Sequence, residues 1–204
     1  MAEAGTGDVQ ALAAFIAEPI NGSGGVIVPP AGYFERVQAI LKKHDILFIV
    51  DEVICGFCRT GQMFGSDSFQ LKPDMMTVAK GLSAAYQPIS GLLITDAINE
   101  ALKAGSRKLG AFAHGLTYAA HPVAAAVALE TINIYRDRKI VDHVQALSPY
   151  FFERLNALTD HPLVGEVRGM GLLAAIEITA DKSKKTPFPP EAGIGAWIQD
   201  KAME

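Results

Sequence analysis

The sequence predicts an α/β protein with a mostly parallel β-sheet and helices on both faces. In its first half, short apolar runs alternate with amphipathic stretches, which is typical of parallel strands joined by crossover helices. The run "ILFIV" is apolar at every position, as expected for an interior parallel strand. Half of the 204 residues are hydrophobic, so the chain can bury a sizeable core.

The predicted elements follow in chain order. We expect strands within residues 13–20, 46–50, 73–82 and 89–95, and helices within 33–45, 96–102 and 121–137. Asp96 is the expected N-cap of the second helix, and Pro122 suits the first position of the third. Residues 139–158 have a helical pattern that Pro149 should kink or break. Strand periodicity returns over 163–178, residues 183–193 are a predicted loop, and a last helix begins at 194.

The change of pattern near residue 139 predicts two incomplete domains. Residues 1–138 form part of a larger α/β domain, and 139–204 form part of a smaller C-terminal α+β domain.

Charge and hydropathy exclude several classes of function. The formal net charge is -4 and there is no basic run, so no nucleic-acid partner is expected. No apolar run reaches the roughly 20 residues of a membrane helix. The first ten residues lack the pattern of a secretory signal. These features predict a cytoplasmic protein whose two cysteines are unpaired.

Three ionisable residues follow three predicted strands. Glu18, Asp51 and Lys80 each come where an apolar run stops. Ligands of open α/β sheets bind beyond the carboxyl ends of the strands. Each residue alone is best explained as a turn residue or a helix cap, whereas the three together favour a site.

An acid and a lysine at one sheet edge suit pyridoxal 5'-phosphate. A desolvated lysine amine can form a Schiff base with an aldehyde. An aspartate facing the pyridine nitrogen keeps that nitrogen protonated, so the ring can withdraw electrons.

Several ordered motifs resemble the class III, or omega-type, aminotransferases, which are pyridoxal-phosphate enzymes of fold type I. The motifs are "AEPINGSGGVIVPP", "IVDEVICGFCRTGQMFG", "MMTVAKGLSAAYQPISG", "HGLTYAAHPVAAAVALE" and "VGEVRGMGLLAAIEI". The resemblance implies that the chain is a central to C-terminal fragment. The cofactor's phosphate cup and stacking aromatic would precede it, and a substrate-binding arginine would follow it, so we expect weak cofactor binding by the fragment alone.

The resemblance also implies roles for five residues. Lys80 resembles the Schiff-base lysine that moves the proton, and Asp51 resembles the partner of the pyridine nitrogen. Val53 resembles the residue packed on one face of the ring, and Glu18 the carboxylate near the substrate side. Thr117 resembles the threonine that binds the cofactor phosphate of the neighbouring subunit, which implies a homodimer.

The family implies an amino donor and a keto acid acceptor such as pyruvate as small-molecule substrates. Many relatives acting on ornithine, acetylornithine or 4-aminobutyrate carry glutamine where this chain has Ile54. The isoleucine makes the chain more similar to the amine:pyruvate group. An aminomutase or decarboxylase of the same fold, or a catalytically silent dimerisation fragment, remains an alternative.

Cys55 and Cys58 form a C-x-x-C motif that also occurs in redox proteins and metal sites. They lie in a loop after a strand, whereas a redox dithiol favours a helix N-terminus. Two cysteines cannot complete a zinc site, so no metal is expected. Cys58 stands where the family usually has glycine, and it would be strained if the turn needs a positive φ. Arg168 is either a carboxylate binder or a surface strand residue.

Overall fold

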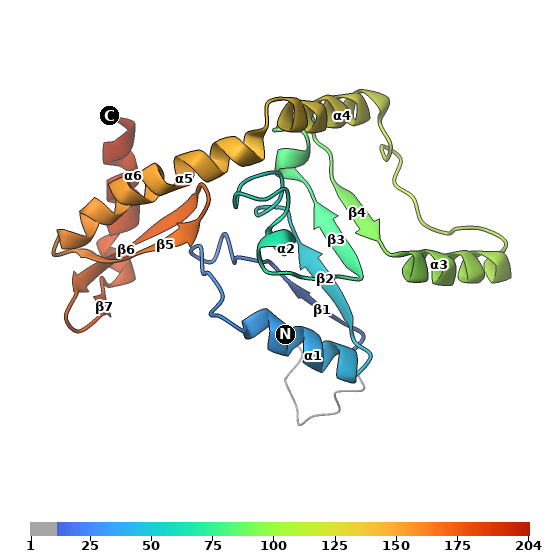
Figure 1. Ribbon diagram of the computed structural model, residues 1–204, viewed down its shortest axis with the longest axis horizontal. Helices are drawn as coiled ribbons and strands as arrows, with labels where there is room; N and C mark the ends of the chain where they lie inside the picture. Colours follow the sequence, from blue (N-terminus) through green and yellow to red (C-terminus); the bar gives the residue numbers. More distant parts are fainter. Residues whose placement is uncertain (1–11) are drawn as a thin grey trace.

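The computed structural model describes residues 12–204, in two β-sheets with flanking helices (Figure 1). The strands are β1 Ala14–Ala17, β2 Leu47–Asp51, β3 Met75–Val78, β4 Gly91–Ile94, β5 Val164–Met170, β6 Leu173–Asp181 and β7 Thr186–Pro187. The α-helices are α1 Tyr33–Lys43, α2 Gly65–Ser68, α3 Asp96–Leu109, α4 Pro122–Asp137, α5 Ile140–Asn156 and α6 Ile194–Met203. Short 3-10 helices are η2 Lys80–Leu82, η3 Ala157–Asp160 and η4 Pro190–Ala192. No helix within 12–204 is long and apolar enough to cross a bilayer.

The first sheet has the strand order β1-β2-β3-β4. β2 pairs in parallel with β1 on one side and β3 on the other, while β4 runs antiparallel at the edge. The predicted interior parallel strand is therefore β2, and the predicted α/β class with a mostly parallel sheet is confirmed.

The main core lies between one face of this sheet and α1. Phe48 and Val50 of β2 are buried against Phe34 and Leu41 of α1, because alternate strand residues point to the same face. Asp51 belongs to the opposite face. There Ile16 of β1 and Leu92 of β4 each remain 57% exposed.

The second sheet consists of β5, β6 and β7, and its β5–β6 hairpin packs on loops of the first sheet. The backbone N–H of Leu172 donates to the Arg59 carbonyl at 2.9 Å, and Met170 and Leu173 pack against the cluster around Ile20. Along the sequence, the strands of the first sheet precede residue 139 and those of the second sheet follow it. The domain division at that residue stays a prediction.

Three local features differ from expectation. α5 continues through Pro149, because the carbonyl that loses its partner belongs to exposed Gln145, where water can replace the lost N–H. Thr95, and not Asp96, occupies the N-cap of α3. A two-residue strand, β7, forms inside the predicted loop, where Thr186 pairs with Asp181. Figure 1 also shows α3 extending away from the sheet, with residues 110–121 as a long connection to α4.

Candidate active site

The candidate site is the carboxyl edge of β2 and β3. Asp51 ends β2, and Lys80 follows the end of β3 in the turn η2. Asp51 is in register with Thr77 of β3, and the Glu52 N–H donates to the Thr77 carbonyl at 3.0 Å. Because the strands are parallel, their carboxyl ends meet at one edge, and Asp51 and Lys80 both lie at this edge.

Asp51 is half-buried and is held by the chain that follows it. One carboxylate oxygen, Oδ1, accepts a hydrogen bond from the Val53 N–H at 3.0 Å. This bond orients the carboxylate and places Val53 next to it, at the start of the loop 52–64.

Lys80 has an exposed side chain and a positive φ of 41°. For a residue other than glycine this left-handed conformation costs roughly 1–2 kcal/mol, so surrounding contacts must maintain it. The Tyr135 hydroxyl donates to the Gly81 carbonyl at 2.7 Å. A Cβ added at Gly81 would lie 2.7 Å from Cβ of Phe57. The turn that carries Lys80 is thus held by α4 on one side and by the Asp51 loop on the other.

Glu18 follows β1 and reaches the same loop. Its Oε2 accepts a hydrogen bond from the Gly22 N–H at 3.0 Å. A Cβ added at Gly22 would lie 2.6 Å from Cδ1 of Ile54 and 3.2 Å from Oε2 of Glu18. Glu18 therefore lies beside the residues that follow Asp51. A hollow of about 380 Å³ opens next to it, between β1 and the start of α1.

Thr117 is not brought to this cluster. It lies in the connection 110–121, in which every residue is exposed, and Figure 1 shows this segment away from the sheet. Its role at a neighbouring subunit stays a prediction.

Glu52 is a structural residue of the site, and no role for it was predicted from the sequence. It is 0% exposed, and its carboxylate accepts hydrogen bonds from the backbone N–H groups of Gly65 and Ser66 and from the Ser66 hydroxyl, at 2.9, 2.5 and 2.5 Å. Burial raises the pKa of the Glu52 carboxyl, while the hydrogen bonds from Ser66 and Gly65 oppose that rise. The feature of the sequence that could have pointed to Glu52 is a carboxylate directly after a buried strand. Sequence alone does not distinguish such a carboxylate from a turn residue.

The two cysteines have the properties of core residues. Both are buried and free. Burial raises the pKa of the Cys55 thiol to about 11, with smaller contributions from the nearby Glu52, Glu18 and Asp51 carboxylates, and burial also raises the pKa of Cys58. A redox dithiol needs a lowered thiol pKa, so these values oppose redox chemistry. Cys58 has a φ of 73°, which is the left-handed conformation that favours glycine. The strain expected for a cysteine at this turn is therefore present.

Arg168 is engaged within the chain. Its Nε donates to the Gly25 carbonyl at 2.8 Å, and its Nη2 pairs with the Glu177 carboxylate at 2.8 Å. Its side chain is only 18% exposed. The guanidinium ties the β5–β6 hairpin to the loop after Glu18 and is not free to bind a substrate carboxylate.

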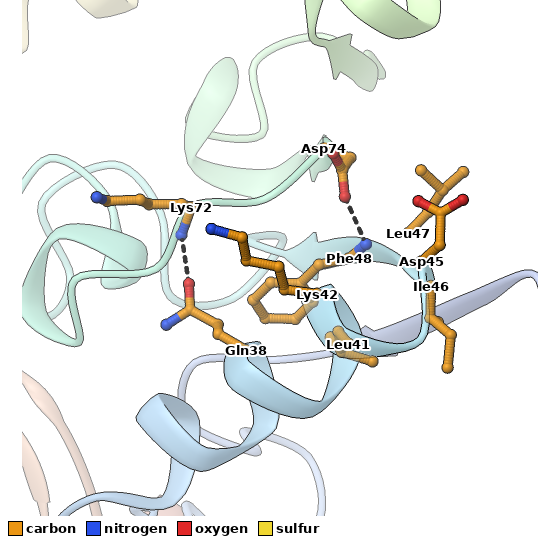
Figure 2. Close-up of a pocket in the computed structure, with 9 residues that line it drawn as sticks. All are labelled: Gln38, Leu41, Lys42, Asp45, Ile46, Leu47, Phe48, Lys72 and Asp74. Atoms are coloured by element: carbon orange, nitrogen blue, oxygen red, sulfur yellow. Dashed lines mark hydrogen bonds between the residues drawn. The ribbon is translucent and has the colours of Figure 1, made fainter. Parts of the chain in front are cut away.

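A different hollow, of about 370 Å³, lies at the amino ends of β2 and β3 (Figure 2). Two hydrogen bonds connect residues that line it. The Lys72 N–H donates to Gln38 Oε1 at 2.9 Å, and the Phe48 N–H donates to Asp74 Oδ2 at 2.8 Å. Ligands of parallel sheets bind at the opposite edge, so this hollow is not the candidate site. Within residues 12–204 no cluster of histidine, cysteine or acidic side chains could hold a metal ion.

The α/β fold, with Asp51 and Lys80 at one sheet edge, is the arrangement expected of a fold type I pyridoxal-phosphate protein, and comparison with known proteins identifies the family. Residues 6–201 match the sequence model of the class-III aminotransferases. The chain belongs to this family, whose members are pyridoxal-phosphate enzymes, which confirms both the resemblance and the cofactor class that it implied.

The chain is similar to several plant transaminases. It is 56% identical over 189 residues to gamma aminobutyrate transaminase 3, chloroplastic, of Solanum lycopersicum, covering 93% of this chain and 36% of that protein. It is 52% identical to the vanillin aminotransferase of Capsicum frutescens, covering 93% of this chain and 41% of that protein. Among solved structures, the omega transaminase from Pseudomonas jessenii in complex with PMP is 50% identical, with a TM-score of 0.85, covering 86% of this chain and 39% of that one. The chain thus spans about two-fifths of the length of the proteins it matches.

One expectation needs correction. The expected cytoplasmic location is wrong, since similar relatives are named as chloroplastic or mitochondrial enzymes. The resemblance to the omega-type group holds, and the similar proteins include gamma-aminobutyrate transaminases as well as an omega transaminase.

Proposed function

We propose that this chain carries the lysine and the aspartate of a pyridoxal-phosphate aminotransferase. The enzyme moves an amino group from an amine or an omega-amino acid, with 4-aminobutyrate included, to a keto acid such as pyruvate. The main supporting observation is that Asp51 and Lys80 lie at the carboxyl edge of two adjacent parallel strands.

The residues at this edge fit the cofactor. Asp51 has one oxygen held by Val53, and its carboxylate can still accept from a protonated pyridine nitrogen. The Lys80 side chain is exposed and forms no ion pair among the residues described, so its amine is available to hold an aldehyde. Thr77, in register with Asp51 on the neighbouring strand, has a buried hydroxyl without a partner, so a protein donor is still available beside this carboxylate.

When bound, the cofactor supplies an electron-withdrawing ring that stabilises charge on the carbon bearing the amine. The residues of this chain supply three functions. Asp51 holds the proton on the ring nitrogen, Lys80 holds the cofactor and moves a proton at the substrate carbon, and Val53 limits the position of the ring plane. Glu18, which lies beside the residues that follow Asp51, would present a carboxylate near the side of the ring where the donor binds.

A homodimer in which Thr117 contacts the neighbouring site is part of this proposal. Its support is the exposure of the whole connection 110–121, whose large apolar residues include Leu116 at 73% and Tyr118 at 86% exposed. Apolar surface of this kind is typical of an interface.

Trapping with borohydride tests the proposal without requiring turnover. The chain is incubated with pyridoxal phosphate, reduced, digested and mapped, and the cofactor is expected on the peptide that contains Lys80. Lys80→Ala should abolish the label, whereas Lys42→Ala, on the surface of α1, should retain it. A label elsewhere, or no label and no yellow absorbance, refutes the assignment and favours a silent fragment. Amino transfer to pyruvate then distinguishes an aminotransferase from an aminomutase or a decarboxylase.

A further inference from the structure

Two buried side-chain polar atoms in residues 12–204 have no hydrogen-bond partner, the hydroxyls of Thr77 and Thr179. A buried unsatisfied hydroxyl destabilises a protein, and each instance requires an explanation. Thr179 lies in β6, whereas Thr77 lies in β3 at the candidate site.

The sheet register places Thr77 beside Asp51. The two residues are partners in the parallel β2–β3 pair, so their side chains point to the same face. The 3.0 Å hydrogen bond from Glu52 N to the Thr77 carbonyl fixes this pairing. On its other side Thr77 pairs with Leu92, whose side chain has no polar atom. Asp51 is therefore the polar side chain next to Thr77 in the sheet.

The Asp51 carboxylate has unused acceptor capacity. An ionised carboxylate offers about four lone-pair sites, and the one hydrogen bond to it among the described residues comes from Val53 N. A pyridine nitrogen would use another of these sites. Because this opposite charge keeps the carboxylate ionised, a further hydrogen bond from a protein donor to it would be charge-assisted.

We propose that Thr77 is a positioning residue for Asp51, and that its hydroxyl donates a hydrogen bond to the Asp51 carboxylate in the cofactor-bound protein. This inference depends on the proposed function. The inference explains why the Thr77 hydroxyl has no partner in the cofactor-free chain. The hydroxyl would form its hydrogen bond only after the cofactor binds, and this bond would stabilise the ionised Asp51 carboxylate that holds the proton on the ring nitrogen.

The test compares Thr77→Val, which removes the hydroxyl at nearly constant shape, with Thr77→Ser, which retains it. Thr179→Val is the matched control, because it removes the other unpartnered buried hydroxyl from the second sheet. The measurements are the melting temperature of the cofactor-free chain and the Kd for pyridoxal phosphate by absorbance titration. A second ligand, 1-deazapyridoxal phosphate, has carbon in place of the ring nitrogen and cannot donate to Asp51.

Thr77→Val should keep or raise the melting temperature and weaken pyridoxal-phosphate binding about tenfold, the effect of one charge-assisted hydrogen bond. It should leave binding of the deaza ligand unchanged. Thr77→Ser should bind like the parent, and Thr179→Val should change the melting temperature alone.

An unchanged Kd for Thr77→Val, an equal loss with both ligands, or a fall in melting temperature would overturn the inference while leaving the proposed function intact. If the parent chain gives no Lys80 label, the proposed function fails first and the inference fails with it.

Discussion

Replacement of Glu52 should strongly destabilise the protein. The side chain is 0% exposed, and its carboxylate satisfies three donors from Gly65 and Ser66. Glu52→Ala leaves all three donors without an acceptor. Each buried donor left unsatisfied costs about 1–3 kcal/mol, so losing the acceptor of three donors removes a large share of the roughly 5–15 kcal/mol that stabilises a domain.

Glu52→Gln should be milder because it keeps one acceptor oxygen. The side-chain amide can still accept from Ser66, but its NH₂ group faces the Gly65 N–H, so one donor is left unpaired at a cost of about 1–3 kcal/mol. Glu130→Ala, at an exposed position on α4, is the matched control and should change stability by less than about 0.5 kcal/mol.

The pH dependence has a defined sign. Burial raises the pKa of Glu52 in the folded chain, so the folded state retains this proton where the unfolded state has lost it. The contribution of this group to stability is therefore fully present below its ordinary value of 4.5 and falls as pH rises through the folded pKa. The difference in unfolding free energy between the parent and Glu52→Gln should therefore decrease as pH rises from 4.5 through the folded pKa of Glu52.

Urea unfolding followed by circular dichroism measures these differences, provided that the m-value stays constant. The reasoning would be refuted if the unfolding free energy of Glu52→Ala lay within about 0.5 kcal/mol of the parent value. It would also be refuted if the difference in unfolding free energy between the parent and Glu52→Gln increased with rising pH.

Two other substitutions test the remaining contacts. Cys58→Gly should shift the unfolding free energy by less than about 1 kcal/mol, because relief of its positive φ is offset by lost burial and by the entropy of glycine; borohydride labelling should persist, and its loss would restore a role for the thiol. Arg168→Met should cost about 2–3 kcal/mol, because the guanidinium is largely buried on Gly25 and Glu177. The exposed Arg136→Met should cost less than about 0.5 kcal/mol, and equal costs for the two would show that the Arg168 contacts contribute nothing.

The parts of the fold that follow from periodicity could be predicted from the sequence. β2 is apolar at nearly every position and is paired on both sides, and Pro122 begins α4 as its fixed φ favours. Positions set by tertiary contacts could not be predicted. α5 continues through Pro149 because its surroundings tolerate the lost hydrogen bond, and nothing local reports that tolerance.

The same division applies to the candidate site. Asp51, Lys80 and Glu18 could be located because strand ends share an edge, and that rule needs only the order of the strands. Glu52 and Thr77 could not be identified, since their significance lies in what their side-chain atoms contact or fail to contact. Thr117 could be named by resemblance alone, because its expected partner belongs to another subunit.

The loop 52–64 couples the charged groups of the site to one another. Glu52 fixes both ends of this loop, through its backbone bond to Thr77 and its side-chain bonds to Gly65 and Ser66. Within the loop, Phe57 packs on the turn that carries Lys80. A change at Glu52 should therefore displace Asp51 and Lys80 together, even though Glu52 itself is fully buried and cannot touch a ligand. Loss of cofactor binding in a folded Glu52→Gln chain would consequently report on the position of the site and would not make Glu52 a catalytic residue.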